Sequence, residues 1–247
     1  MTVKEAVRYQ LRQLKGKPLK SKVSHIISYF WIPIVAVAVL IVLLISQVSS
    51  LTNRKDTVLH ITCINAVAKP EAVEDYCSQL SQLLQVDQSK HIIGVDTSIL
   101  VYQDNMPESY QIVQKLIAMV NAHETDLVFG DFNIIRNFAY SEYFCDLSDV
   151  LPHEAMIKYQ DYLLYIDGTL LPNVTPLTEP IEYPDARKPE TMTDPIPVAL
   201  QIPSSARLSE QFYPHLTGDV AVSVVFNAKN TVNIEAFLKN IMEGIGG

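Results

Sequence analysis

Residues Thr125–Leu151 read TDLVFGDFNIIRNFAYSEYFCDLSDVL, and this stretch decides the expected fold class. The short apolar run of Leu127, Val128 and Phe129 stops at a glycine and an aspartate, and a helical pattern begins almost at once. A strand that turns directly into a helix is typical of α/β proteins, whose ligands lie outside the carboxyl ends of the strands. The stretch therefore leaves two alternatives for Asp131: it caps the following helix, or it faces a ligand.

The same alternation of strand and helix precedes this stretch. Residues 57–64 and 91–102 are rich in β-branched side chains and predict strands. Residues 71–84 and the segment that begins at Pro107 carry apolar side chains at helical spacing. This order predicts βαβ crossovers, hence parallel strands with helices on the faces of the sheet.

The C-terminal half continues with strands. Residues 161–171 resemble a hairpin that turns at Asp167-Gly168, and prolines punctuate 172–197, which predicts a long loop. Two further strands and a terminal helix are expected at 198–202, at 220–226 and from an N-cap at Asn233. The expected fold is a three-layer α/β domain with a mostly parallel sheet of about five strands.

An unbroken apolar run stands before this domain. Residues 29–45 read YFWIPIVAVAVLIVLLI and, with their apolar flanks, exceed the roughly 20 residues needed to cross a bilayer. We therefore expect a transmembrane helix over 26–48, with the lipid bilayer as its partner. The run is longer than the apolar core of a signal peptide, about 7–15 residues, which favours an uncleaved anchor over cleavage beside Ser49-Ser50.

The distribution of charge predicts the orientation of this helix. Residues 1–25 hold seven Lys and Arg residues and one Glu, whereas the remaining chain holds 12 basic and 26 acidic residues, a net charge of −14. The positive-inside rule places 1–25 in the cytoplasm and both a linker at 49–56 and a domain at 57–247 outside the cell. The acidic domain has no basic patch for phosphates, which argues against nucleic acid as a partner.

Known catalytic and cofactor motifs are missing from the sequence. It lacks a G-x-S-x-G elbow, a phosphate-binding loop and an HExxH helix, so we expect neither an enzyme nor a cofactor. The three cysteines make no C-x-x-C pair, so we expect no metal site. Cys63 and Cys77 leave two alternatives, a disulfide or two buried thiols.

Polar residues follow the predicted strands. The candidate ligand-binding residues are Asn65, Tyr102, Asp104, Gly130, Asp131 and Asn133. They are expected to lie close together, because the carboxyl ends of parallel strands meet at one edge of a sheet. Gly130 allows close approach or a left-handed turn. The carboxylates favour a small polar or cationic solute over an anion.

Two stretches resemble type 2 extracellular solute-binding proteins of bacterial ABC importers. The first joins the strand ending in GD at Asp126–Asp131 to EYFCDLSDVL at Glu142–Leu151, and the second is GDVAVSVVFNAKNTVNIEAFLKNIM at Gly218–Met242. The resemblance implies a single lobe of such a protein, carried by a single-pass membrane protein of Gram-positive bacterial type. It implies a non-enzymatic domain that binds a small polar solute. The alternative is a structural module that contacts another membrane protein in an envelope complex and has no ligand.

Overall fold

The computed structural model describes residues 18, 31–32, 35–47, 55–101, 106–171, 183–202, 212–214 and 220–243. The chain divides into two units, Met1–Arg54 and Lys55–Gly247. In the first unit residues 35–47 form a helix whose large apolar side chains are exposed, from 49% at Ile41 to 65% at Val42. Among the described residues, no helix combines the length and the apolar character needed to span a bilayer. The predicted segment 26–48 lies partly outside the described residues and stays a prediction.

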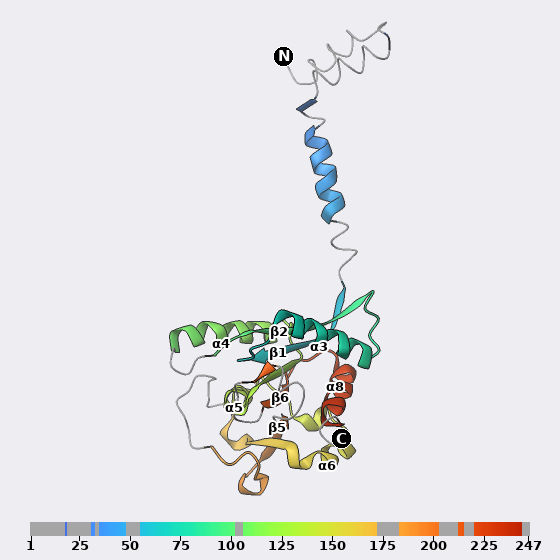
Figure 1. The fold of residues 1–247 in the computed structure, drawn as a ribbon. Coiled ribbons are helices and arrows are strands. Elements are labelled where there is room, and N and C mark those ends of the chain that lie inside the picture. The colour runs from blue at the N-terminus through green and yellow to red at the C-terminus, as the bar shows by residue number, and fades with distance from the viewer. Residues whose placement is uncertain are drawn as a thin grey trace. The chain divides into compact units, whose positions relative to one another are not determined.

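The second unit is built on one six-stranded sheet with the strand order β2-β1-β3-β6-β5-β4 (Figure 1). The strands are β1 (Asp56–Ile64), β2 (His91–Ile99), β3 (Leu127–Asp131), β4 (Leu163–Asp167), β5 (Pro195–Ile202) and β6 (Val220–Val224). β1 pairs in parallel with β2 and β3, whereas the β3–β6, β6–β5 and β5–β4 pairs are antiparallel. The α/β class is confirmed, and the sheet has six strands where about five were expected. The prediction of a mostly parallel sheet is wrong, because three of the five strand pairs are antiparallel.

The error in strand direction has a physical cause. A continuous apolar strand indicates burial on both faces, and every residue of β6 is buried. Burial on both faces follows from a central position in a covered sheet, and the antiparallel strands β5 and β6 occupy such positions too. The apolar pattern therefore reports the position of a strand and not its direction.

Three local predictions also differ from the structure. The expected hairpin at 161–171 does not form: β4 pairs with β5, with Asp167 opposite Pro195, and Gly168–Leu170 is a 3₁₀ turn. β5 begins within the segment predicted as a loop. The terminal helix begins at Thr231, and the side chain of Asn233 donates a 3.0 Å hydrogen bond to the Val58 carbonyl instead of capping the helix.

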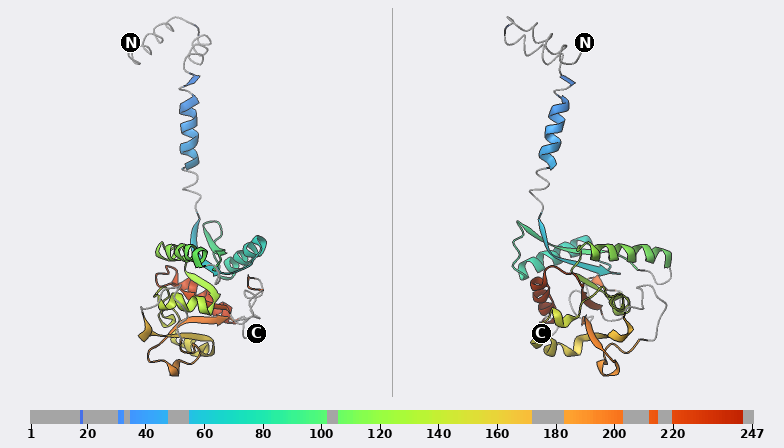
Figure 2. Two further views of the ribbon diagram at one scale, coloured as in Figure 1. Left: turned by 90° about the vertical axis from the view of Figure 1, so that its left-hand side faces the viewer. Right: turned by 180° about the vertical axis from the view of Figure 1, so that it is seen from behind.

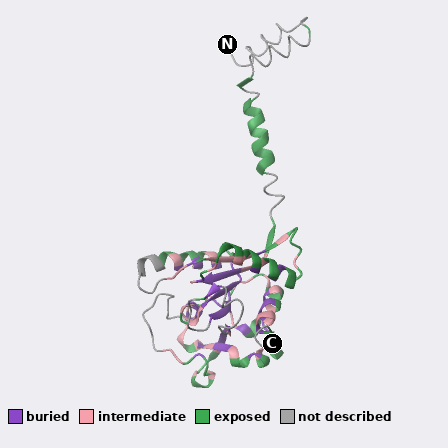
Figure 3. Ribbon diagram, in the orientation of Figure 1, coloured by how far each residue is buried: buried purple, intermediate pink, exposed green. Residues whose placement is uncertain are grey.

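Helices cover both faces of the sheet, which gives the three layers (Figure 2). One core lies between the sheet and α3 (Pro70–Leu83), α6 (His153–Lys158) and α8 (Thr231–Glu243); the other lies between the sheet and α4 (Met106–Asn121) and α5 (Phe132–Tyr140). Successive strand residues alternate between these cores, as Val222 and Ala221 of β6 do. Burial is accordingly concentrated in the strands (Figure 3).

Candidate functional site

The junction between β3 and α5 is built by Asp131. Its Oδ1 accepts a 2.7 Å hydrogen bond from the backbone N–H of Asn133, so the carboxylate caps α5 and the capping alternative is confirmed. Gly130, the preceding residue, packs closely on β1, because a Cβ added there would lie 3.2 Å from Cβ of Ile64. The missing side chain at this position lets the two strands approach each other.

Asn65 connects the end of β1 to the chain after β2. It has a φ of 58°, in the left-handed region that asparagine tolerates. Its Nδ2 donates to the Val101 carbonyl at 3.0 Å, and its Oδ1 accepts from the Val101 N–H at 2.6 Å. The amide is thus bound to backbone. Tyr102 and Asp104, the candidates that follow, lie outside the described residues.

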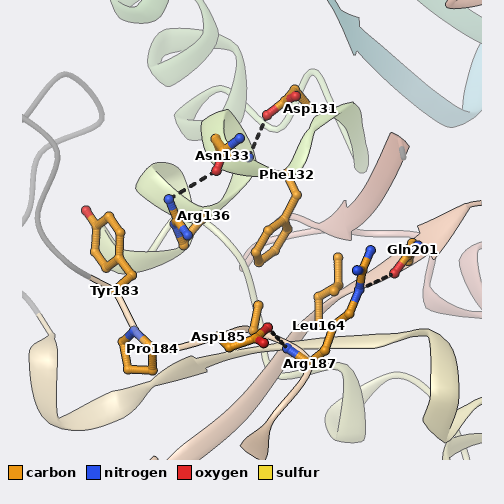
Figure 4. A pocket seen from close by; sticks show the side chains of 11 residues that line it. Asp131, Phe132, Asn133, Arg136, Leu164, Tyr183, Pro184, Asp185, Arg187 and Gln201 are labelled. Atoms are coloured by element: carbon orange, nitrogen blue, oxygen red, sulfur yellow. Dashed lines mark hydrogen bonds between the residues drawn. The ribbon is translucent and has the colours of Figure 1, made fainter. Parts of the chain in front are cut away.

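A cavity of about 320 Å³ lies beside the junction of β3 and α5 (Figure 4). Its lining comes from the first turns of α5, from β4 and β5, and from residues 183–187. Asp131 and Asn133 belong to the lining, whereas Asn65 and Gly130 are not among its described residues. The structure therefore brings two of the predicted site residues together in one cavity.

The wall that contains Tyr183 is fastened to the sheet and to α5. The carbonyl of Ala186 accepts a 2.9 Å hydrogen bond from the N–H of Tyr165 in β4. The hydroxyl of Tyr183 donates to Oδ1 of Asn137 at 3.2 Å. Its ring stacks on Tyr140, with ring centroids 4.7 Å apart and an interplanar angle of 13°. These contacts hold the wall next to the helix.

Arg136 makes both polar and aromatic contacts in the cavity. Its guanidinium carbon lies 4.2 Å from the ring centroid of Tyr183 and 5.9 Å from that of Phe132. Its Nη2 donates to Oδ1 of Asn133 at 3.1 Å. Burial lowers the pKa of the guanidinium, which still carries its charge at neutral pH. Its Nε is buried and has no hydrogen-bond partner within the described structure.

A second arginine, Arg187, lines the same cavity. Its Nε donates to Oε1 of Gln201 in β5 at 3.0 Å. Its backbone N–H donates to Oδ1 of Asp185 at 3.1 Å, and Asp185 also forms a 3.2 Å ion pair with Lys188. In the view of Figure 4, the ring of Phe132 lies between the two arginine side chains. The cavity therefore presents basic groups and an aromatic surface.

Sequence reasoning missed the other polar residues of the lining, which are Arg136, Tyr183, Asp185, Arg187 and Gln201. Tyr183 and Arg187 lie in the proline-rich segment, whose position in space no local pattern indicates. Arg136 did carry a signal, because it is the one charged side chain in the nine residues of α5. An isolated arginine directly after a strand end is a reasonable candidate for a ligand contact.

A second cavity, of about 380 Å³, lies beside His60 and Asp126, before the start of β3. The carboxylate of Asp126 accepts hydrogen bonds from the backbone N–H groups of His60 at 2.9 Å and Lys229 at 3.2 Å. Burial lowers the pKa of His60. Throughout the described ranges, no group of three or more His, Cys, Asp and Glu side chains is arranged to hold a metal ion. The Asp126 carboxylate beside this cavity therefore holds two backbone segments in place.

The three cysteines are free thiols, so the Cys63–Cys77 disulfide does not form in this structure. Burial raises the pKa of the Cys63 and Cys145 thiols to about 12. At neutral pH neither is a thiolate, the form that acts as a nucleophile.

Comparisons of the chain with family models, with curated proteins and with solved structures find no match.

Proposed function

We propose that this chain is a membrane-anchored binding protein whose domain at 57–247 lies outside the cell and holds a small polar solute without converting it. The cavity beside α5 is the observation that carries this proposal. Its volume of about 320 Å³ lies at the lower end of the range for small-molecule sites, roughly 300–1,000 Å³. A metabolite-sized solute therefore fits it.

The position and the composition of the cavity both support a binding role. Asp131 is the last residue of β3, so the cavity lies at the carboxyl end of that strand, where open α/β sheets bind ligands. Polar groups from distant parts of the chain converge there, held by hydrogen bonds such as those of Asn133 to Arg136 and of Arg187 to Gln201. Groups fixed in this way can orient a ligand without reorganisation.

The hydrogen bonds that the carboxylates of the cavity accept favour binding over catalysis. Asp131 accepts a hydrogen bond from the N–H of Asn133, and Asp185 accepts one from the N–H of Arg187. Each carboxylate therefore holds backbone in place. A general base instead needs a pKa and an orientation suited to taking a proton from the substrate.

The membrane anchor is supported by the helix at 35–47. Its exposed valine, leucine and isoleucine side chains form the kind of surface that needs lipid or protein to cover it. The basic segment before it and the acidic domain after it match a cytoplasmic N-terminus. Protease added to intact cells should degrade the domain and spare 1–25; an intact domain beside degraded surface proteins would contradict this location.

The solute can be sought with thermal unfolding of the full chain in nanodiscs. The panel contains anionic, neutral and cationic polar molecules of metabolite size. At a hundredfold excess over Kd a ligand adds about 2.7 kcal/mol, which raises Tm by about 5–10 °C for a domain of this size. Asn133→Trp should abolish the shift by filling the cavity, whereas Glu190→Trp, at an exposed position outside the described lining, should keep it. The proposal fails if no solute raises Tm.

A further inference from the structure

We infer that the solute carries a carboxylate group and that Arg136 is the residue that binds this group. The inference rests on the proposed function, since it names the chemical class of the ligand in the same cavity. It differs from the expectation of a cationic or neutral solute that the sequence suggested, because two arginines line the same cavity as Asp131.

The first argument is the unused hydrogen-bonding capacity of Arg136. A guanidinium has five N–H donors in a rigid planar fork. In the described structure Nη2 donates to Asn133, and the buried Nε has no partner. Buried polar groups in proteins are nearly always hydrogen-bonded, so an orphaned donor on a residue that lines a cavity leaves room for a ligand or ordered solvent as its partner. A carboxylate placed against this edge of the fork would satisfy it with two parallel hydrogen bonds.

The second argument is charge. Arg136 is half-buried, and no carboxylate of the described residues lies within ion-pair distance of it. Removal of a cation from water without a counter-ion is unfavourable. Asp185 does not provide this counter-ion, since it is paired with Lys188. An anionic group on the ligand would compensate the charge of the guanidinium.

The third argument limits the number of charges on the ligand. The described ionisable lining comprises Asp131, Asp185, Arg136 and Arg187, so their formal charges cancel. A phosphate dianion would be attracted by the two guanidinium groups but repelled by the two carboxylates, so the neutral lining gives its double charge little net attraction. A carboxylate with a single negative charge meets less repulsion. The rings of Phe132 and Tyr183 offer apolar contact area to the rest of such a molecule.

Arg136 is also positioned before any ligand arrives. Its contact with the ring of Tyr183 and its hydrogen bond to Asn133 hold the guanidinium next to α5. Tyr183 is in turn stacked on Tyr140. A side chain that is already ordered loses less conformational entropy when it binds. Arg136 differs in this respect from Lys188, whose exposed side chain forms a surface ion pair next to the cavity.

The test is calorimetric titration of the full chain in nanodiscs of neutral phosphatidylcholine. The probes are the monocarboxylates acetate, butanoate and hexanoate, the amides and the amines of the same chain lengths, and inorganic phosphate. At least one carboxylate should bind more tightly than its amide, its amine and phosphate. Arg136→Gln should weaken that binding by at least about tenfold, and Arg136→Lys should restore part of it. Lys239→Gln, which breaks a surface ion pair on α8 at the other face of the sheet, should leave it unchanged.

Several results would overturn the inference. One is a neutral or cationic probe that binds as tightly as the carboxylates. Another is carboxylate binding that both Arg136 variants leave unchanged while their Tm matches that of the parent chain. In each case a solute still binds, so the proposed function stands and only the ligand class is wrong. Absence of binding by every probe and by the wider solute panel would overturn both proposals.

Discussion

Asn65 and Val101 exchange two hydrogen bonds, one in each direction, between an amide side chain and the backbone. The pair ties the end of β1 to the chain that leaves β2, and Asn65 holds a left-handed conformation to make it. The residue was predicted to face a ligand at the strand ends. Its two hydrogen bonds give it a role in joining two parallel strands.

Replacement of Asn65 should therefore destabilise the domain. Asn65→Ala removes both hydrogen bonds and places a side chain at a positive φ, for an expected loss of about 2–4 kcal/mol in the free energy of unfolding. Asn65→Gly loses the same hydrogen bonds without the backbone strain, so it should lie between Ala and the parent chain. Urea unfolding of the three proteins measures the order. Equal stabilities for the Ala and Gly variants would contradict the strain argument.

A smaller effect is expected at the start of α5. Asp131→Ala removes the acceptor for the N–H of Asn133 and should lower the free energy of unfolding by about 1 kcal/mol. Asp131→Ser keeps a capping oxygen and should retain most of that stability. The same urea experiment compares them. A serine variant as unstable as the alanine variant would show that the carboxylate does more than cap the helix.

The pH dependence of stability should reveal the hydrogen bonds of Asp167. The N–H of Thr193, the hydroxyl and N–H of Thr169 and the N–H of Asp194 lower the pKa of Asp167 from 3.8 to about 2. Because the folded-state pKa is depressed, the ionised group contributes its stability above about pH 4, and this is lost as the pH falls toward about 2.

Asp167→Asn should therefore unfold at lower urea concentration than the parent chain near neutral pH. The difference between the two midpoints should shrink below about pH 4. Asp161→Asn, for a group outside these hydrogen bonds, serves as the control. A midpoint difference that stays constant from neutral pH to about pH 2.5 would contradict the assignment.

Alkylation should distinguish the three thiols. Cys63 is fully buried, and burial raises the pKa of both Cys63 and Cys145 to about 12. Iodoacetamide applied to the native chain should thus modify the half-buried Cys77 first. Mass spectrometry of the digest identifies the modified residues, and the unfolded chain in urea should react at all three. Persistent protection of Cys63 and Cys77 in urea, lost on reduction, would instead indicate a disulfide between them.

The sequence predicted those parts of the fold that depend on local periodicity. The positions of β1, α3, β2 and β3 follow from β-branched runs and helical spacing, and the Asp131 cap follows from a carboxylate directly before a helix. Strand direction in the second half could not be predicted in this way, because the apolar pattern of β6 records burial alone.

Only part of the candidate site was predicted, because contacts between distant parts of the chain leave no local pattern in the sequence. Asp131 and Asn133 lie next to the strand end that pointed to them, and both line the cavity. Tyr183 and Arg187 reach the cavity only because the chain after β4 returns along that strand, where Ala186 binds Tyr165. Contacts across such distances in sequence have no local signature. The contribution of Tyr183 and Arg187 to the site could therefore not be predicted before the fold was known.

The most direct test of solute binding beside α5 is hydrogen–deuterium exchange of the full chain in nanodiscs, with and without the most strongly stabilising solute of the thermal panel. Slower exchange is expected in 131–137 and 183–188 when the solute is bound, with no change around His60 and His123 at the second cavity. Unchanged exchange in both segments, or protection confined to the second cavity, would contradict the account.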